Sequence, residues 1–117
     1  MRVLVCGGRE YDDEERVFSI LDAFHRDCGP IAAIIHGGAA GADLLGHKWA
    51  IRNLPVLSVK FSANWKKHGK RAGPIRNQLM LDVGKPDHVI AFPGGRGTAD
   101  MILRAKAAGI PVREVIQ

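Results

Sequence analysis

Short apolar runs alternate along this chain with longer stretches in which apolar residues recur every three or four positions. The short runs predict five strands, at residues 2–6, 31–36, 55–59, 87–92 and 111–116. Helical spacing between them predicts four helices, at residues 13–27 and 42–53, from about residue 74 to 83, and at 98–108. Because parallel neighbouring strands need a crossover connection, this strict alternation predicts a parallel sheet.

We therefore expect an α/β fold: a single doubly wound five-stranded parallel sheet, Rossmann-like, with helices on both faces. The length of 117 residues suits one domain spanning residues 1–117. Residues expected to face the core are Val17, Ile20, Leu21, Phe24 and Cys28 in the first helix, Leu45 and Trp49 in the second, and Ile75, Leu79 and Val83 in the third.

Composition places the chain among ordinary globular proteins, with 46% hydrophobic and 25% charged residues. The N-terminal apolar run is too short for a signal peptide, and no segment approaches the roughly 20 apolar residues of a membrane span. We expect a soluble cytoplasmic protein with no membrane partner. Cys6 and Cys28 lack metal or redox spacing, so both are expected to be reduced core residues. No motif predicts a metal or another cofactor.

Positive charge is concentrated in the middle of the chain. The formal net charge is +5, and no acidic residue lies between Asp43 and Asp82. Eight basic residues fall inside that stretch: Lys48, Arg52, Lys60, Lys66, Lys67, Lys70, Arg71 and Arg76. One face or loop is therefore strongly positive. It is either a solvated surface or a surface for a phosphate-bearing ligand or a nucleic-acid backbone.

Three of the predicted strands end in glycine-rich turns, CGGREY, HGGAAGAD and FPGGRGTAD. In an open doubly wound sheet, ligands bind outside the carboxyl ends of the strands, where the strand order reverses. Glycines there allow backbone N–H groups to approach a ligand's oxygens. The candidate ligand-binding residues in these turns are Gly7, Gly8, Arg9, Gly37, Gly38, Asp43, Pro93, Gly94, Gly95, Arg96, Gly97 and Thr98.

The turn at residues 93–98 favours an anion. Gly94, Gly95 and Gly97 are able to adopt positive φ and direct N–H groups into a concavity, and Thr98 is a natural N-cap for the following helix. Arg96 adds a full positive charge. Neither a Walker-type G-x-x-x-x-G-K-[ST] nor a G-x-G-x-x-G after the first strand is present.

Other polar residues near the strand ends admit two interpretations. Asp43 either complements the dipole of the second helix or contacts a ribose or base. If Glu10 and Asp12 are functional, they face the same crevice. Tyr11 either offers a stacking surface for a ligand or is a half-buried packing residue. His36 is interpreted as a structural histidine.

The basic segment FSANWKKHGKRAG is long for a connection in a domain of this size, and such loops are commonly functional. Trp65 lies there among lysines and arginines, which suits either a lid over a small nucleotide or a surface for single-stranded nucleic acid. Arg76 follows, within the first turn of the third helix, and is expected to lie near the anion-binding turn.

The succession VCGGREY, HGGAAGAD, ANWKKHGKRAGPIRNQLM and AFPGGRGTADM resembles the YspA-like branch of the SLOG superfamily. This Rossmann-like superfamily is named after the DNA-processing protein DprA and the Lonely Guy enzymes. The resemblance covers nearly the whole chain. It implies a nucleotide-derived ligand across the strand ends, with phosphate on the PGGRGT turn, in a protein that senses or processes nucleotide-like molecules. It also implies a homodimer or higher homo-oligomer.

The Lonely Guy enzymes, which are phosphoribohydrolases of nucleoside monophosphates, carry signatures close to P-G-G-x-G-T-x-x-E and M-H-x-R-K-x-x-M. Arg76 matches their catalytic arginine, Asn77 replaces their lysine, and Met101 stands where they have a glutamate. Asp100, one residue earlier, is the nearest carboxylate and the alternative catalytic candidate beside Arg76. The sequence thus favours nucleotide binding and leaves open whether the protein is an enzyme. The alternatives are a phosphoribohydrolase and a DNA-binding role like that of DprA.

Overall fold

Five short strands form one sheet in the computed structural model, which describes residues 1–116. They are β1 (Arg2–Cys6), β2 (Ala33–His36), β3 (Leu57–Lys60), β4 (His88–Ala91) and β5 (Val112–Glu114). Their order is β3-β2-β1-β4-β5, and every neighbouring pair is parallel. The predicted Rossmann-like parallel sheet is confirmed.

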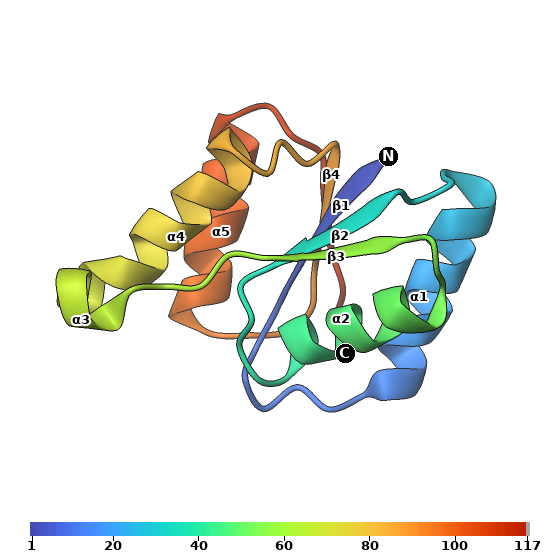
Figure 1. Cartoon of the computed structure of the whole chain (residues 1–117), viewed down its shortest axis with the longest axis horizontal. Coiled ribbons are helices and arrows are strands. Elements are labelled where there is room, and N and C mark those ends of the chain that lie inside the picture. The colour runs from blue at the N-terminus through green and yellow to red at the C-terminus, as the bar shows by residue number, and fades with distance from the viewer. Residues whose placement is uncertain (117) are drawn as a thin grey trace.

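Helices cover both faces of the sheet, as the sequence predicts. The longer ones are α1 (Glu14–Asp27), α2 (Ala42–Arg52), α4 (Ala72–Asp82) and α5 (Arg96–Ala107). Figure 1 shows α1 and α2 on one side of the sheet, and α4 and α5 together on the other. A short helix, α3 (Trp65–His68), and a 3₁₀ turn, η1 (Gly69–Arg71), precede α4 within the basic segment.

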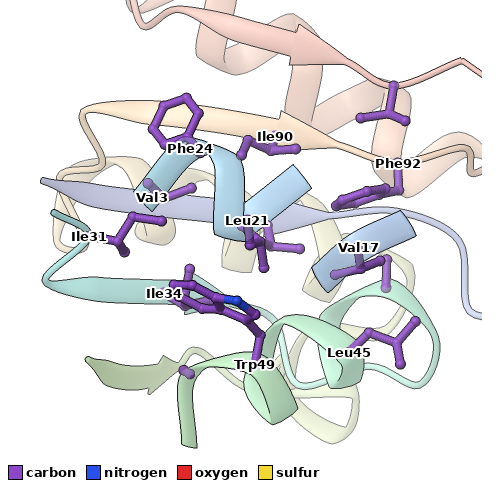
Figure 2. Packing of buried hydrophobic residues seen from close by; sticks show 14 of the residues in the cluster. Val3, Val17, Leu21, Phe24, Ile31, Ile34, Leu45, Trp49, Ile90 and Phe92 are labelled. Carbon is purple, nitrogen blue, oxygen red and sulfur yellow. The ribbon is translucent and has the colours of Figure 1, made fainter. Parts of the chain in front are cut away.

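Each face of the sheet has its own hydrophobic core. Side chains alternate along β1, so that Val3 and Val5 face α1 and α2, whereas Leu4 and Cys6 face α4 and α5. The first core is built around the fully buried Trp49 and includes Val17, Leu21 and Phe24 of α1, with Ile20 partly buried against it (Figure 2). Because both faces are covered, the central strands consist mostly of buried apolar residues, which explains their continuous hydrophobic runs.

The strand order reverses beside β1. The chain builds outward from β1 through β2 to β3 and then crosses to the other side of β1 for β4 and β5. Cys6 pairs in register with Ala91, so the carboxyl ends of β1 and β4 adjoin. Their following helices, α1 and α5, lie on opposite faces. This is the switch point at which open parallel sheets form a ligand crevice.

Two predictions about the core are wrong. Cys28 is exposed, because α1 ends at Asp27 and Cys28 is its C-cap rather than a further residue of the buried face. In α4, Leu79 and Val83 are 45% and 62% exposed, and Ile75 is only partly buried. The helix instead buries Ala72, Asn77, Met80 and Leu81.

The buried face of α4 combines the core residues Met80 and Leu81 with a polar contact to α5. The Asn77 amide donates to the Gly97 carbonyl (3.2 Å) and to the Asp100 carboxylate (2.9 Å), both in α5. These bonds satisfy a polar side chain in a buried position. Within residues 1–116, every helix is too short or too polar to traverse a lipid bilayer.

Candidate functional site

A pocket of about 760 Å³ opens at the carboxyl ends of β1 and β4. Its walls come from the turn after β1, the start of α2, the α3–η1 segment, α4 and the first turn of α5. The volume lies within the roughly 300–1,000 Å³ typical of small-molecule sites. The predicted crevice is therefore a real cavity at the switch point.

Glycines allow the turns after the strands to pack tightly around this pocket. The Gly8 N–H donates to the Pro93 carbonyl (2.9 Å), and the Ala42 N–H donates to the Gly8 carbonyl (3.2 Å). A Cβ atom on Gly7 would lie 2.6 Å from that of Ala42, and one on Gly8 would lie 3.0 Å from the Pro93 oxygen. Gly7 and Gly8 both line the pocket and hold the turn after β1 against the turn after β4.

The N-terminus of α5 opens into the pocket without a capping side chain. Gly95 is the N-cap and makes no side-chain cap bond, whereas the Asp13 carboxylate caps α1 by accepting from the Arg16 N–H. The first turn of α5 also contains no acidic residue. Because the first N–H groups of a helix have no partner within the helix and carry its positive dipole end, this terminus suits an anion.

Space around this terminus is open. A Cβ atom on Gly95 or on Gly97 would meet nothing within 4 Å, and both residues line the pocket with Arg96 and Thr98. At Gly94, by contrast, a Cβ atom would come 2.7 Å from the Gly8 nitrogen and against the Thr98 side chain. Gly94 is therefore needed for packing, and Gly95 and Gly97 leave the helix terminus accessible.

Two predictions about this turn are wrong. Thr98 is not the N-cap, because α5 begins two residues earlier, at Arg96, and Thr98 is a buried residue of its first turn. Gly94, Gly95 and Gly97 do not have positive φ; among the glycines of the described chain, positive φ occurs at Gly38, Gly41, Gly69 and Gly109. The turn reaches the helix with ordinary backbone, and glycine contributes space rather than left-handed conformation.

Asp43 and Arg76 both hydrogen-bond to the turn after β2. The buried Asp43 carboxylate accepts from the N–H groups of Gly37 (2.8 Å) and Ala39 (3.4 Å). Arg76 Nη1 donates to the Gly37 carbonyl (2.9 Å). Burial raises the pKa of Asp43, against the opposing effect of these backbone bonds and of Arg76. Burial also lowers the pKa of Arg76, against the opposing effect of Asp43. Each charge thus stabilises the other.

Asp100 lines the pocket, but its carboxylate is already engaged. Oδ2 accepts from Arg104 Nε (2.8 Å) and from Asn77 Nδ2 (2.9 Å). Met101, at the position of the Lonely Guy glutamate, also lines the pocket, although it is only 1% exposed. Beside Arg76, the pocket therefore has the Asp100 carboxylate, which is bonded to Arg104 and Asn77, and a methionine at the position of the Lonely Guy glutamate.

Several candidate residues lie beside the pocket rather than in its wall. Gly37, Gly38, Pro93 and Gly94 do not line it and instead form the turns behind it. Tyr11 does not offer a stacking surface to the pocket; it is buried and packs against Phe92, with ring centroids 5.4 Å apart. The core-packing interpretation of Tyr11 is confirmed.

His36 is a structural histidine, as interpreted from the sequence. Its Nδ1 accepts from the Gly38 N–H (3.1 Å), and its Nε2 lies 2.8 Å from Ser58 Oγ. Burial lowers the pKa of His36 to about 4, helped by His47 and Lys60, so the ring is neutral near pH 7. Within residues 1–116, His, Cys, Asp and Glu side chains do not gather in a group of three or more that would bind a metal.

Sequence reasoning missed part of the wall. Asn77, Gly73, Pro74 and Met80 of α4 line the pocket together with Cys6 at the end of β1. Burial raises the pKa of the Cys6 thiol to about 12, so it is a protonated, apolar part of the floor. The signals in the sequence that pointed to this helix were Arg76, which matches the Lonely Guy arginine, and the neighbouring Asn77, which replaces the Lonely Guy lysine.

The five-stranded parallel sheet with helices on both faces defines a Rossmann-like α/β protein. The chain belongs to the YspA, cpYpsA-related SLOG family, whose model matches residues 1–68. It is also similar to "Gene 61 protein" of Mycobacterium phage D29, with 39% identity over 118 aligned positions that cover 95% of this chain and 93% of that protein. The predicted family is confirmed, and the phage protein extends the similarity across α4 and α5.

Proposed function

We propose that this protein binds a nucleotide or a nucleotide-derived ligand in the pocket, with a phosphate group at the N-terminus of α5. The observation that carries the proposal is the uncapped first turn of that helix, open to the pocket at Gly95 and Gly97. Membership of the SLOG family supports a nucleotide-related function. Helix N-termini at switch points are common phosphate sites in open α/β folds.

The charges around the pocket support an anionic ligand. Arg9, Lys70 and Arg96 are exposed at its rim, and Arg76 lies deeper in the wall. Of the three acidic side chains there, Asp43 is held by backbone N–H groups and Asp100 by Arg104. These two carboxylates are therefore partly neutralised, and the remaining carboxylate, Glu10, is exposed. The balance favours a ligand that carries negative charge.

We further propose that the protein senses its ligand rather than hydrolyses it. A phosphoribohydrolase needs a carboxylate close to the sugar to stabilise a positive centre or to activate water, by analogy with glycoside hydrolysis. Asp100 is adjacent to Met101 in the sequence, and its Oδ2 already accepts two hydrogen bonds. Of the other two carboxylates that line the pocket, Asp43 is held by backbone N–H groups and Glu10 is exposed to solvent. If the protein is a phosphoribohydrolase, a nucleoside monophosphate incubated with it should release free base. If it is a sensor, the nucleotide should be recovered intact.

Calorimetric titration with the nucleoside 5′-monophosphates, each against its nucleoside, tests the proposal. We expect saturable binding of the monophosphates and much weaker binding of the nucleosides. At 100 times its dissociation constant, a bound ligand stabilises the fold by roughly 2.7 kcal/mol, which a thermal melt detects. Absence of binding to any monophosphate, together with affinity for single-stranded DNA that falls steeply with salt, would favour the DNA-binding alternative.

We also propose that the protein forms a homodimer, as the family resemblance implies. Leu79 of α4, its C-cap Val83 and Leu103 of α5 are exposed apolar side chains, and the two helices pack together on the same face of the sheet. Sedimentation equilibrium between about 1 and 100 μM should give a mass that rises toward twice the chain mass of 12.7 kDa. A mass that stays at the monomer value over this range would contradict the proposal.

A further inference from the structure

The two tryptophans of the chain have opposite environments. Trp49 is fully buried in the core beneath α1, and its indole N–H donates to Asp22 (2.8 Å). Trp65 is 50% exposed and lines the pocket. A half-exposed indole is costly in a solvated surface segment, because its large apolar face stays in water. Its position at the pocket therefore needs a reason other than the core.

Local contacts hold Trp65 at the pocket wall. It opens α3, whose N-cap Asn64 accepts from the Lys67 N–H (3.1 Å). A Cβ atom on Gly73 would lie 3.5 Å from Cη2 of the indole, which is ordinary van der Waals contact. The edge of the ring thus rests on α4 at a position where no side chain intervenes. None of the residues of α3 is buried, so the core does not fix this segment.

The pocket has two chemically different walls. The α5 wall offers backbone N–H groups and Arg96. The α3–α4 wall offers the apolar surfaces of Trp65, Gly73 and Pro74. The buried Met80 of α4 and Met101 of α5 also line the pocket. A bare phosphate or a sugar phosphate would satisfy only the first wall. A ligand that joins a phosphate to a flat aromatic ring satisfies both.

We infer that Trp65 is the base-stacking residue of the site, so that the ligand carries its nucleobase against the indole and its phosphate at the N-terminus of α5. The inference rests on the proposed function and adds to it the orientation of the ligand. Stacking on an aromatic ring tolerates any base, because every base has a π-face. The four nucleoside monophosphates should therefore differ in affinity much less than any of them differs from ribose 5-phosphate.

Tryptophan fluorescence reports on this stacking directly, because only Trp65 is exposed. Titration with adenosine 5′-monophosphate should quench the red-shifted emission of the exposed indole, and titration with ribose 5-phosphate should leave the emission unchanged. In Trp65→Phe the remaining emission comes from the buried Trp49 and should not respond to either compound. This variant serves as the spectroscopic control.

The affinities of Trp65 variants for the two compounds provide the second part of the test. Trp65→Leu should weaken adenosine 5′-monophosphate binding by about tenfold, the effect expected for loss of one base–aromatic stack, and leave ribose 5-phosphate binding unchanged. Trp65→Phe keeps an aromatic ring and should restore most of the affinity. Because α3 lies outside both cores, all three proteins should unfold at the same temperature.

Two results would overturn the inference, and they are distinguishable. If adenosine 5′-monophosphate binds wild type and Trp65→Leu equally and without quenching, the base lies elsewhere, and the phosphate site of the proposed function stands. If none of the four monophosphates and no ribose 5-phosphate binds wild type, the proposed function fails and the stacking site fails with it.

Discussion

Replacing Gly95 by aspartate should abolish binding of the phosphate-bearing ligand and leave the protein folded. Gly95 is the N-cap of α5, has a negative φ of −103°, and leaves open space where a Cβ atom would be. Aspartate is a preferred N-cap, so its carboxylate should occupy the first-turn N–H groups and raise the stability by about a few tenths of a kcal/mol. Those are the N–H groups proposed to bind phosphate.

The size of the effect follows from the charge. A carboxylate and a phosphate charge about 4 Å apart repel by about 4 kcal/mol at an effective dielectric constant of about 20, and solvent reduces this figure. We expect affinity to fall by about 100-fold or more in calorimetry. Gly95→Asn, of similar size and without charge, is the matched control and should lose less. Unchanged affinity in a folded Gly95→Asp protein would remove the N-terminus of α5 from the site.

Arg76→Ala should give the second large loss of affinity. Arg76 lies in the pocket wall and binds the Gly37 carbonyl, which leaves the guanidinium with further donors for a ligand oxygen. Loss of a hydrogen bond to a charged group costs about 1.5–3 kcal/mol, or roughly 10- to 150-fold in the dissociation constant. The change also removes the cation that opposes the raised pKa of Asp43, so this pKa should rise further.

A double variant separates the two roles of Arg76. Asp43→Asn combined with Arg76→Ala removes the buried charge that the single variant leaves without its partner, and it should recover thermal stability without recovering affinity. Full recovery of affinity would mean that Arg76 acts only by bracing the turn after β2. Product analysis of the same samples should find intact nucleotide with wild type. Free base that accumulates in proportion to wild-type protein, and not with Arg76→Ala, would establish the phosphoribohydrolase instead.

The sequence predicted the sheet well because burial on both faces makes its three central strands mostly apolar. It predicted α1 equally well, where the buried residues are all apolar and recur with helical spacing. The sequence-based prediction of the buried face was wrong for α4, because two different faces of this helix carry apolar residues. The stripe of Ile75, Leu79 and Val83 looks like a core face, but the true buried face includes the polar Asn77. Packing of Met80 and Leu81 in the second core, together with bonds from Asn77 to residues 20 and 23 positions later in α5, fixes that face.

The sequence predicted where the pocket lies, but it did not predict the exact start of α5 or the short helix α3. Glycine-rich turns mark strand ends from local sequence, and the pocket lies where those after β1 and β4 meet. The start of α5 was placed two residues late, because Thr98 is a strong N-cap by type and the true N-cap, Gly95, has no capping side chain. The α3 helix was missed because its four residues bury nothing and show no amphipathic pattern.

The backbone amide signals of the first turn of α5 test the phosphate site most directly. In a ¹⁵N-labelled sample titrated with adenosine 5′-monophosphate, the largest chemical-shift changes should fall on the amides of residues 95–98, with smaller changes near Trp65. Adenosine alone should leave residues 95–98 unmoved. If the monophosphate saturates the protein and these four amides do not shift while others do, the phosphate binds elsewhere and the proposed site is wrong.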